Sequence, residues 1–250
     1  FFFFSDANET RRAAMSEPGD RPRRALFDPE TIPHDPAFSD PAARGDVVDA
    51  RRLHPAALRE RFARPPAWQP ELRADPRLFK LDMEPRPAAV LVPLVVRGTD
   101  VHVLLTERTA HLSDHAGQIS FPGGRVEEHD ANPAATALRE TEEEIGLAGG
   151  LIDIVGSLPE YTTVTGYHVT PVVGIIERPF ALTLDSFEVS EAFEVPLAFL
   201  MDPAHHERRI VVDGGETRTF YAMPYQASRR YFIWGATAAM LRNLYHFLRA

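Results

Sequence analysis

The segment 132–146 constrains the fold of this chain more than any other, because it carries its own start and stop signals for a helix. Asn132 is a preferred N-cap residue, and Pro133 occupies the first helical position, where no amide donor is needed. Gly146 is a typical residue for ending a helix. Between these signals, one stripe at helical spacing contains Ala134, Leu138, Thr141 and Ile145. The sequence therefore predicts a helix over 133–145 that packs this stripe against a sheet.

Apolar runs predict the strands of that sheet. Residues 88–96 form a nearly continuous apolar run, as in a buried strand, and a Gly-Thr-Asp turn at 98–100 leads into a second strand at 101–106. Further strands are expected at 152–158, 169–176, 193–197, 209–212, 218–221 and 231–233. Two more helices are expected at 55–62 and 237–248. Many strands with few helices indicate a mixed α+β domain.

The prolines divide the chain into an N-terminal part and a main domain. Thirteen of the 22 prolines fall in the first 87 residues. Residues 1–50 are predicted to be a disordered or extended arm, because they show no apolar periodicity. Residues 1–14 precede the first methionine, Met15, and are interpreted as a non-native segment. Residues 51–87 are predicted to be a helical lead-in and linker, and residues 88–250 the main domain.

The composition excludes several classes of protein. The chain contains no cysteine, which excludes disulfides, thiol nucleophiles, and thiolate zinc or iron–sulfur sites. Its net charge of −9 argues against a general nucleic-acid-binding protein, which needs a basic surface. No apolar run approaches the roughly 20 residues that span a bilayer, so no membrane association is expected. The acidic balance is compatible with an enzyme that captures anionic substrates through metal ions.

The predicted helix 133–145 carries a second, acidic face. Glu140, Glu143 and Glu144 fall within one arc on its last two turns. Like charges at this spacing destabilise a helix, and carboxylates near its C-terminus oppose the helix dipole. A hard divalent cation would reverse that cost, because Mg²⁺ and Mn²⁺ prefer carboxylate oxygens. The alternative is a solvated acidic surface, and the helix by itself leaves both interpretations open.

These residues resemble the Nudix box of the Nudix hydrolase superfamily. The stretch begins at Gly124 and ends with Arg-Glu-Thr-Glu-Glu-Glu-Ile-Gly-Leu at 139–147. It departs from the usual pattern at two points. Asp130 stands where glutamate is usual, with eight residues rather than seven before Arg139, and Thr141 replaces an apolar residue. The resemblance implies a Nudix fold, in which a mixed β-sheet is sandwiched between helices, for residues 88–250.

The segment before the box is similar to the signature of the coenzyme A pyrophosphatase branch. The matching stretches are Leu-Leu-Thr-Glu-Arg-Thr at 104–109 and His-Ala-Gly-Gln-Ile-Ser-Phe-Pro-Gly-Gly at 115–124. Residues 164–174 and 231–235 resemble the same branch. Ser113 stands where the branch commonly has arginine, which weakens the inference about contacts with substrate phosphates.

The resemblance also implies a set of site residues. Glu140, Glu143 and Glu144 would bind Mg²⁺ or Mn²⁺, with a backbone carbonyl near Gly123 as a further ligand. Glu143, Glu144 or the loop residue Glu188 would take part in catalysis, although Glu188 fits equally well as an exposed loop glutamate. The residues expected to contact substrate phosphates are Arg108, His115 and Arg125, and Asp130 is expected to pair with Arg139. A structural role is the alternative for His115.

The sequence therefore predicts a metal-dependent pyrophosphohydrolase that acts on coenzyme A or its derivatives, in the cytoplasm. One alternative is a Nudix hydrolase of another nucleoside diphosphate derivative, such as ADP-ribose. Another is a non-catalytic module that binds nucleotide, although such a module should have lost acidic positions of the box. The expected partner is a small-molecule substrate, and a homodimer is left open.

Overall fold

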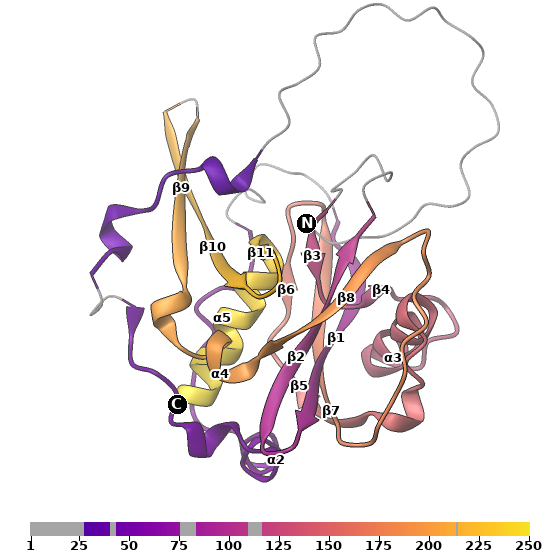
Figure 1. The fold of residues 1–250 in the computed structure, drawn as a ribbon. Helices are drawn as coiled ribbons and strands as arrows, with labels where there is room; N and C mark the ends of the chain where they lie inside the picture. Colours follow the sequence, from indigo (N-terminus) through magenta and orange to yellow (C-terminus); the bar gives the residue numbers. More distant parts are fainter. Residues whose placement is uncertain (1–27, 41–43, 76–83, 110–116, 214) are drawn as a thin grey trace, which may run out of the picture.

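A large mixed sheet forms the centre of the computed structural model, which describes residues 28–40, 44–75, 84–109, 117–213 and 215–250 (Figure 1). Its principal strands are β1 (Arg86–Arg97), β2 (Asp100–Arg108), β5 (Asp153–Ser157), β7 (Tyr167–Ile176) and β8 (Val189–Pro196). Strand β1 pairs parallel with β7 and antiparallel with β2, and β2 pairs antiparallel with β8. Three short strands complete the sheet: β3 (Ile119–Ser120), β4 (Gly123–Arg125) and β6 (Tyr161–Thr162).

The segment 119–125 joins two strands that separate at one end. Strand β3 pairs with the end of β2, whereas β4 pairs with the beginning of β1. Immediately afterwards the chain enters helix α3 (Pro133–Ile145), so this segment fixes α3 relative to the sheet.

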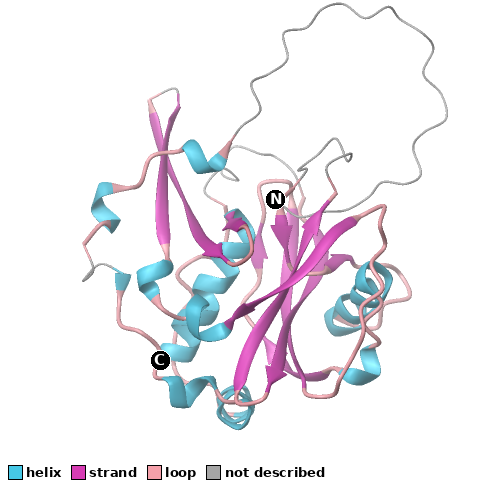
Figure 2. Ribbon diagram, in the orientation of Figure 1, coloured by secondary structure: helices cyan, strands magenta, loops and turns pink. Residues whose placement is uncertain are grey.

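Helices cover both faces of the large sheet (Figure 2). Helix α3 packs on one face, where its Ala137 and Ile145 join a buried cluster with Ala89, Leu91 and Val95 of β1. The opposite face contacts helix α5 (Gly235–Arg249), and alternate residues of β1 bury there instead: Val90, Val92 and Leu94. Strand β1 is therefore apolar along most of its length because it is buried on both sides.

A second sheet and the N-terminal segments lie around α5. The second sheet contains β9 (Glu207–Asp213), β10 (Glu216–Gln226) and β11 (Arg230–Trp234), all antiparallel. Short helices α4 (Leu197–Leu200) and η6 (Pro203–His205) connect β8 to β9, and η5 (Gly149–Leu151) follows α3.

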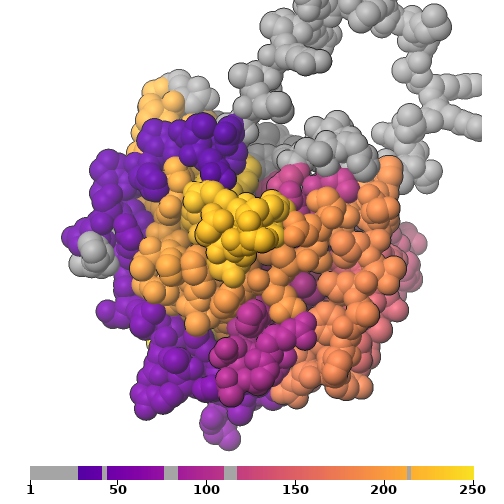
Figure 3. Space-filling view, viewed as in Figure 1, coloured from indigo at the N-terminus to yellow at the C-terminus, as the bar shows by residue number. Residues whose placement is uncertain are grey.

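The described part of the predicted N-terminal arm follows the edge of β9. It contains η1 (Pro29–Thr31) and η2 (Pro36–Phe38) and leads to η3 (Ala50–Leu53) and α2 (Pro55–Ala63). The amide of Asp35 donates to the carbonyl of Arg208, and that of Ile210 donates to the carbonyl of Pro33. Figure 3 shows this indigo segment lying along the molecule beside the orange region that contains β9 and β10. Residues 1–27, 41–43 and 76–83 lie outside the described residues, and the domain boundaries at 50 and 87 remain predictions.

The α+β fold class and the three helices are confirmed. Helix α3 has the predicted bounds, and α2 and α5 extend the predicted helices by one to two residues at their ends. Strands β8 and β10 are longer than predicted, and β3, β4 and β6 were not predicted, because strands this short carry no apolar periodicity. Within the described segments, no helix has the length and apolar character needed to cross a membrane.

Candidate active site

The candidate site lies on the side of helix α3 that faces β4. The Asn132 side chain accepts a hydrogen bond from the amide of Ala135 at 2.9 Å, and Gly146 ends the helix in the left-handed conformation, with φ of 69°. Thr141, on the buried face, donates its hydroxyl to the Ala137 carbonyl at 2.6 Å. That bond explains how threonine replaces an apolar residue of the box, because its hydroxyl is buried with a partner.

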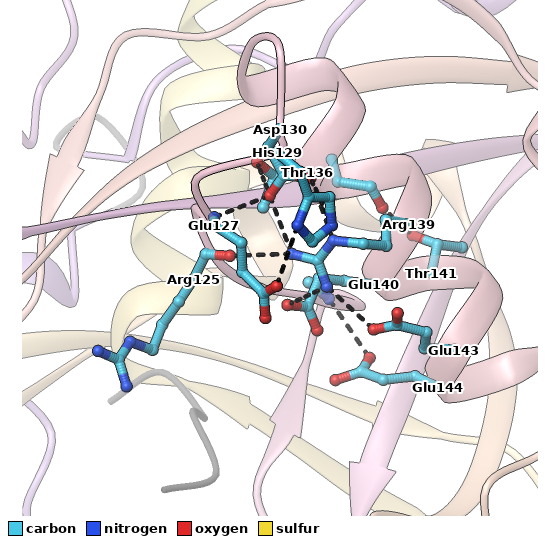
Figure 4. A network of polar contacts seen from close by, with 12 residues as sticks. Arg125, Glu127, His129, Asp130, Thr136, Arg139, Glu140, Thr141, Glu143 and Glu144 are labelled. Carbon is cyan, nitrogen blue, oxygen red and sulfur yellow. Dashed lines mark hydrogen bonds and ion pairs between the residues drawn. The ribbon is translucent and has the colours of Figure 1, made fainter.

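The guanidinium of Arg139 is the centre of the polar network shown in Figure 4. Its Nε and Nη2 donate to the two carboxylate oxygens of Asp130, at 3.1 and 3.0 Å. Its Nη1 donates to Oε1 of Glu140 and to Oε2 of Glu143, both at 3.0 Å. Nη2 also reaches the carbonyl of Arg125 at 3.1 Å. One arginine therefore orients two of the predicted metal ligands, and the predicted ion pair between Asp130 and Arg139 is present.

Asp130 is itself held in place from two sides. Its Oδ2 accepts hydrogen bonds from the Thr136 hydroxyl and the Glu127 amide, both at 2.9 Å. The hydrogen bonds from Arg139 hold the pKa of Asp130 well below its usual range and raise the pKa of the arginine. The eight residues between Asp130 and Arg139, one more than usual, therefore still allow an ion pair with two hydrogen bonds. Thr136 was missed by the sequence reasoning, although it lies one helical turn before Arg139.

Two glycines allow the site to form close to the sheet. A Cβ atom at Gly124 would overlap the carboxylate of Glu140, so glycine at this position leaves the space that Glu140 occupies. Gly123 has a φ of 153° and lies so close to β1 that a Cβ would overlap the Ala89 carbonyl. The amide of Gly123 donates to Oε2 of Glu144 at 3.3 Å. Gly123 therefore contacts the helix through its amide. Its carbonyl remains a predicted metal ligand.

Glu140 and Glu144 carry negative charge that their surroundings do not fully balance. Burial, together with the charges of Glu140 and Glu188, raises the pKa of Glu144 well above its usual value, although the Gly123 amide and Arg108 act in the opposite direction. Burial also raises the pKa of Glu140, against the effect of Arg139 and with a contribution from Glu188. Glu143 is exposed at the rim of the group. These pKa shifts are the electrostatic signature of a site that favours added positive charge.

The loop 183–189 brings Glu188 to the helix. The amides of Thr183 and Asp185 donate to the last carbonyls of α3, those of Ile145 and Glu144, each at 2.9 Å. At its other end, the Glu188 carbonyl accepts from the Thr109 amide at 3.0 Å, just after β2. The loop therefore caps the C-terminus of α3 and holds the half-buried Glu188 near Glu140 and Glu144.

The three predicted phosphate contacts have different positions. Arg108, at the end of β2, lies close enough to Glu144 for its charge to lower the pKa of that carboxyl. Arg125 contributes its carbonyl to the network, whereas Figure 4 shows its side chain extending away from the carboxylates of α3. His115 and Ser113 lie outside the described residues.

The donor chemistry of the site fits a hard divalent cation. Glu140 and Glu144 supply carboxylate oxygens, and burial and the charges of neighbouring carboxylates raise their pKa values. In the described part of the chain, no three His, Asp or Glu side chains form a ready-made group of metal ligands. Here the carboxylates are hydrogen-bonded to protein donors, Glu140 and Glu143 to Arg139 and Glu144 to the Gly123 amide.

Comparisons with known proteins find similar sequences and structures. Residues 85–218 match the model of the NUDIX domain. The chain is 40% identical over 169 residues to the uncharacterized Nudix hydrolase NudL of Escherichia coli K12, covering 68% of this chain and 86% of NudL. Among solved structures, it is similar to an Ap4A hydrolase of C. elegans, with 21% identity, a TM-score of 0.39, and coverage of 44% of this chain and 80% of that one. It is also similar to a MutT protein of Methanosarcina mazei, with 23% identity, a TM-score of 0.39, and coverage of 49% and 84%.

Proposed function

The chain belongs to the NUDIX domain family of hydrolases, and from this premise we propose that it hydrolyses the diphosphate bond of coenzyme A or of its derivatives. The observation that carries the hydrolysis is the group of Glu140, Glu144 and Glu188, in which burial and then neighbouring carboxylates raise the pKa of the two helix carboxyls. The choice of coenzyme A rests on the resemblance of residues 104–109 and 115–124 to the signature of that branch.

Divalent cations are part of the proposal. Nudix hydrolases generally use Mg²⁺ or Mn²⁺, and here Glu140, Glu143 and Glu144 would hold the ion, with the Gly123 carbonyl as a further ligand. When bound, such an ion supplies positive charge to the diphosphate oxygens and lowers the pKa of a bound water.

The chain's own residues orient the site and prepare it for substrate. Arg139 holds Glu140 and Glu143 in place, and Asp130 fixes the arginine. Arg108, on the same face as Glu144, would contact the substrate phosphates, because a guanidinium can donate two hydrogen bonds to them. His115 and Arg125 remain proposed contacts for the same groups.

The proposed reaction is an attack of water on one phosphorus of the diphosphate. The water oxygen forms a new P–O bond, and the bond between that phosphorus and the bridging oxygen breaks. A carboxylate accepts the proton of the water, and Glu143, Glu144 and Glu188 are the proposed candidates. The products are 3′-phosphoadenosine 5′-phosphate and 4′-phosphopantetheine, or the acyl form of the latter.

The experiment that tests this function separates the products by chromatography. The protein is incubated with coenzyme A or with ADP-ribose, each with Mg²⁺ or Mn²⁺ and each with EDTA. Glu144→Gln is the inactive variant, and the exposed Glu142→Gln on the same helix is its matched control. We expect 3′-phosphoadenosine 5′-phosphate only with metal, from the wild type and Glu142→Gln. Glu188→Gln tests the loop residue, and unchanged turnover at saturating Mg²⁺ would remove it as ligand and base.

The other outcomes identify the alternatives. Cleavage of ADP-ribose without cleavage of coenzyme A would keep the hydrolase and reject the proposed substrate. Tight binding of nucleotide without release of any phosphomonoester would instead indicate a non-catalytic module.

A further inference from the structure

Gln118 is a buried side chain whose polar atoms are not hydrogen-bonded. It is only 4% exposed, and within the described part of the chain neither its Nε2 nor its Oε1 has a hydrogen-bond partner. Leaving such a group unsatisfied costs on the order of 1–3 kcal/mol, and folded proteins contain few examples. An orphaned buried amide is therefore a reason to look for a ligand.

A β-bulge places Gln118 beside Arg108. Arg108 donates its amide to the Gln118 carbonyl at 3.0 Å, while its own carbonyl accepts from the Gly117 amide at 3.2 Å. Two residues therefore oppose one, and Gly117, with φ of 74°, adopts the left-handed conformation that this bulge requires. The residue opposite Arg108 shares its face of the sheet, so Gln118 lies beside Arg108 on that face.

This face is the one that carries the candidate site. Next along the ladder, Ser120 pairs with Thr106, which lies on the same side of β2 as Leu104, a member of the cluster beneath α3. Ile119 points the other way, into the cluster that contains α5. The charge of Arg108 acts on Glu144, which places the end of β2 next to the carboxylates.

A second buried amide shows what a structural role looks like in this molecule. Asn243 of α5 is 1% exposed, and its Nδ2 donates to the Leu72 carbonyl at 2.6 Å. Its Oδ1 accepts from the Leu72 amide at 3.1 Å. Asn243 therefore ties α5 to the N-terminal segment, whereas the equally buried amide of Gln118 ties nothing together.

We propose that the carboxamide of Gln118 binds an uncharged polar group of the substrate, a hydroxyl or an amide, beside the diphosphate. A phosphate is a poor partner, because the amide oxygen would face anionic oxygens, which a guanidinium binds better. A hydroxyl or an amide can both donate to Oε1 and accept from Nε2. This inference rests on the proposed function for the identity of the substrate. Coenzyme A presents hydroxyls and two amides, whereas ADP-ribose presents hydroxyls and no amide.

The test combines stability with kinetics. Gln118→Met keeps the length of the side chain and removes its polar atoms, and Gln118→Leu is a second apolar variant. We expect the melting temperature of the free protein to stay the same or rise, because no hydrogen bond is lost. The kcat/KM for the substrate should fall about 10- to 100-fold, mainly through KM. Asn243→Leu is the matched control, and it should lower the melting temperature while leaving kcat/KM unchanged.

The substrate comparison identifies the group that Gln118 contacts. A loss with coenzyme A alone would indicate an amide of the pantetheine arm, and an equal loss with ADP-ribose would indicate a group of the shared adenosine, a ribose hydroxyl or the adenine edge. If the wild type cleaves only ADP-ribose, the proposed substrate is wrong, and the Gln118 variants are then compared with wild type by kcat/KM for ADP-ribose. If it cleaves neither, dissociation constants for both ligands replace kcat/KM, and binding of neither overturns the inference. A lowered melting temperature with unchanged kcat/KM would also overturn it, because the amide would then be structural.

Discussion

Two groups of partly buried charges, one on α3 and one beside α5, shift the pKa of a glutamate in opposite directions. On α3, burial and neighbouring carboxylates raise the pKa of Glu144. Beside α5, burial of Glu71 acts in the same direction, but hydrogen bonds from His246 and Tyr221 and the charge of Arg242 lower its pKa to about 2. The glutamate beside α5 is thus balanced by the protein itself, whereas the one on α3 is not.

The balanced group is also the better connected one. Arg242 is 3% exposed, donates to Oε2 of Glu71 at 2.8 Å and to Nδ1 of His206 at 3.0 Å, and lies over the ring of Tyr245 at 4.8 Å. His206 donates in turn to the Leu200 carbonyl at 2.7 Å. This network joins α5 to the N-terminal segment and to the residues around η6. A buried charge that the protein balances holds elements together, whereas a buried charge that it leaves unbalanced indicates a site that needs a ligand.

The largest expected effect comes from breaking the balanced group. Arg242→Met should lower the free energy of unfolding by about 3–5 kcal/mol, because it leaves Glu71 partly buried without its cation. Urea unfolding at pH 7 measures the loss, with the solvent-facing Arg249→Met as control. The kcat of the remaining folded protein should not change. A loss below about 1 kcal/mol would mean that the network contributes little beyond a surface ion pair.

A pair of glutamate substitutions tests the comparison directly. Glu71→Gln should lower the free energy of unfolding by about 2–3 kcal/mol, because Arg242 and His246 lose their carboxylate. Glu144→Gln, measured with EDTA, should leave that free energy unchanged or raise it, because it removes a charge that Glu140 and Glu188 repel. Equal destabilisation by both substitutions would contradict the distinction between the two groups.

The pH dependence of stability should separate two titrations in the balanced group. Burial lowers the pKa of His206 to about 4, so the unfolded chain takes up a proton first and stability falls as the pH drops from about 6.5 to 4. The pKa of Glu71 is lowered to about 2, so its contribution is present above about 4.5 and is lost between there and pH 2. Each loss should be about 3 kcal/mol.

Urea midpoints across this pH range, with EDTA, measure the two losses. His206→Leu should change the pH dependence of the midpoint only between about pH 6.5 and 4. Glu71→Gln should change it only between about pH 4.5 and 2. The same pH dependence in all three proteins would show that neither group contributes through its pKa.

The ion pair between Asp130 and Arg139 should serve the site rather than the fold. Asp130→Asn should lower kcat/KM about 10- to 100-fold, because asparagine cannot hold both prongs of Arg139, and Glu140 and Glu143 then lose their orientation. The exposed Glu128→Gln is the control. Steady-state kinetics at saturating Mg²⁺ measure the effect. A large loss of stability with unchanged kcat/KM would instead give the pair the structural role that Arg242 has.

The part of the fold that sequence could predict is the part fixed by local chemistry. Helix α3 was predicted with its observed bounds, because Asn132, Pro133 and Gly146 act within one turn of its ends. Strand β10 extends well beyond its predicted length, because it continues through Pro224, which pairs with Phe232 of β11. The pairing of residues 222–226 with β11 extends the strand, and such a contact between separate segments cannot be read from local sequence.

The same distinction applies to the candidate site. Helical periodicity predicted that Glu140, Glu143 and Glu144 share a face, and the predicted partner of Arg139 is observed. The loop that holds Glu188 and the missing partners of Gln118 depend on contacts between distant segments, which sequence spacing does not encode. The Glu71 network was missed for that reason, since its members come together only in the folded chain.

The smallest expected effect concerns how the two helices are stabilised. Helix α3 packs one face and depends on a side-chain cap, whereas α5 is buried along most of its length, and its first residue follows Trp234, which provides no side-chain cap. Asn132→Ala should therefore lower the free energy of unfolding by about 1 kcal/mol, since the Ala135 amide loses its acceptor. Asn132→Asp should restore it, because aspartate caps equally well and favours the positive end of the helix dipole. Urea unfolding compares the three proteins, and Asn132→Ala without any loss would show that packing alone holds α3, as it holds α5.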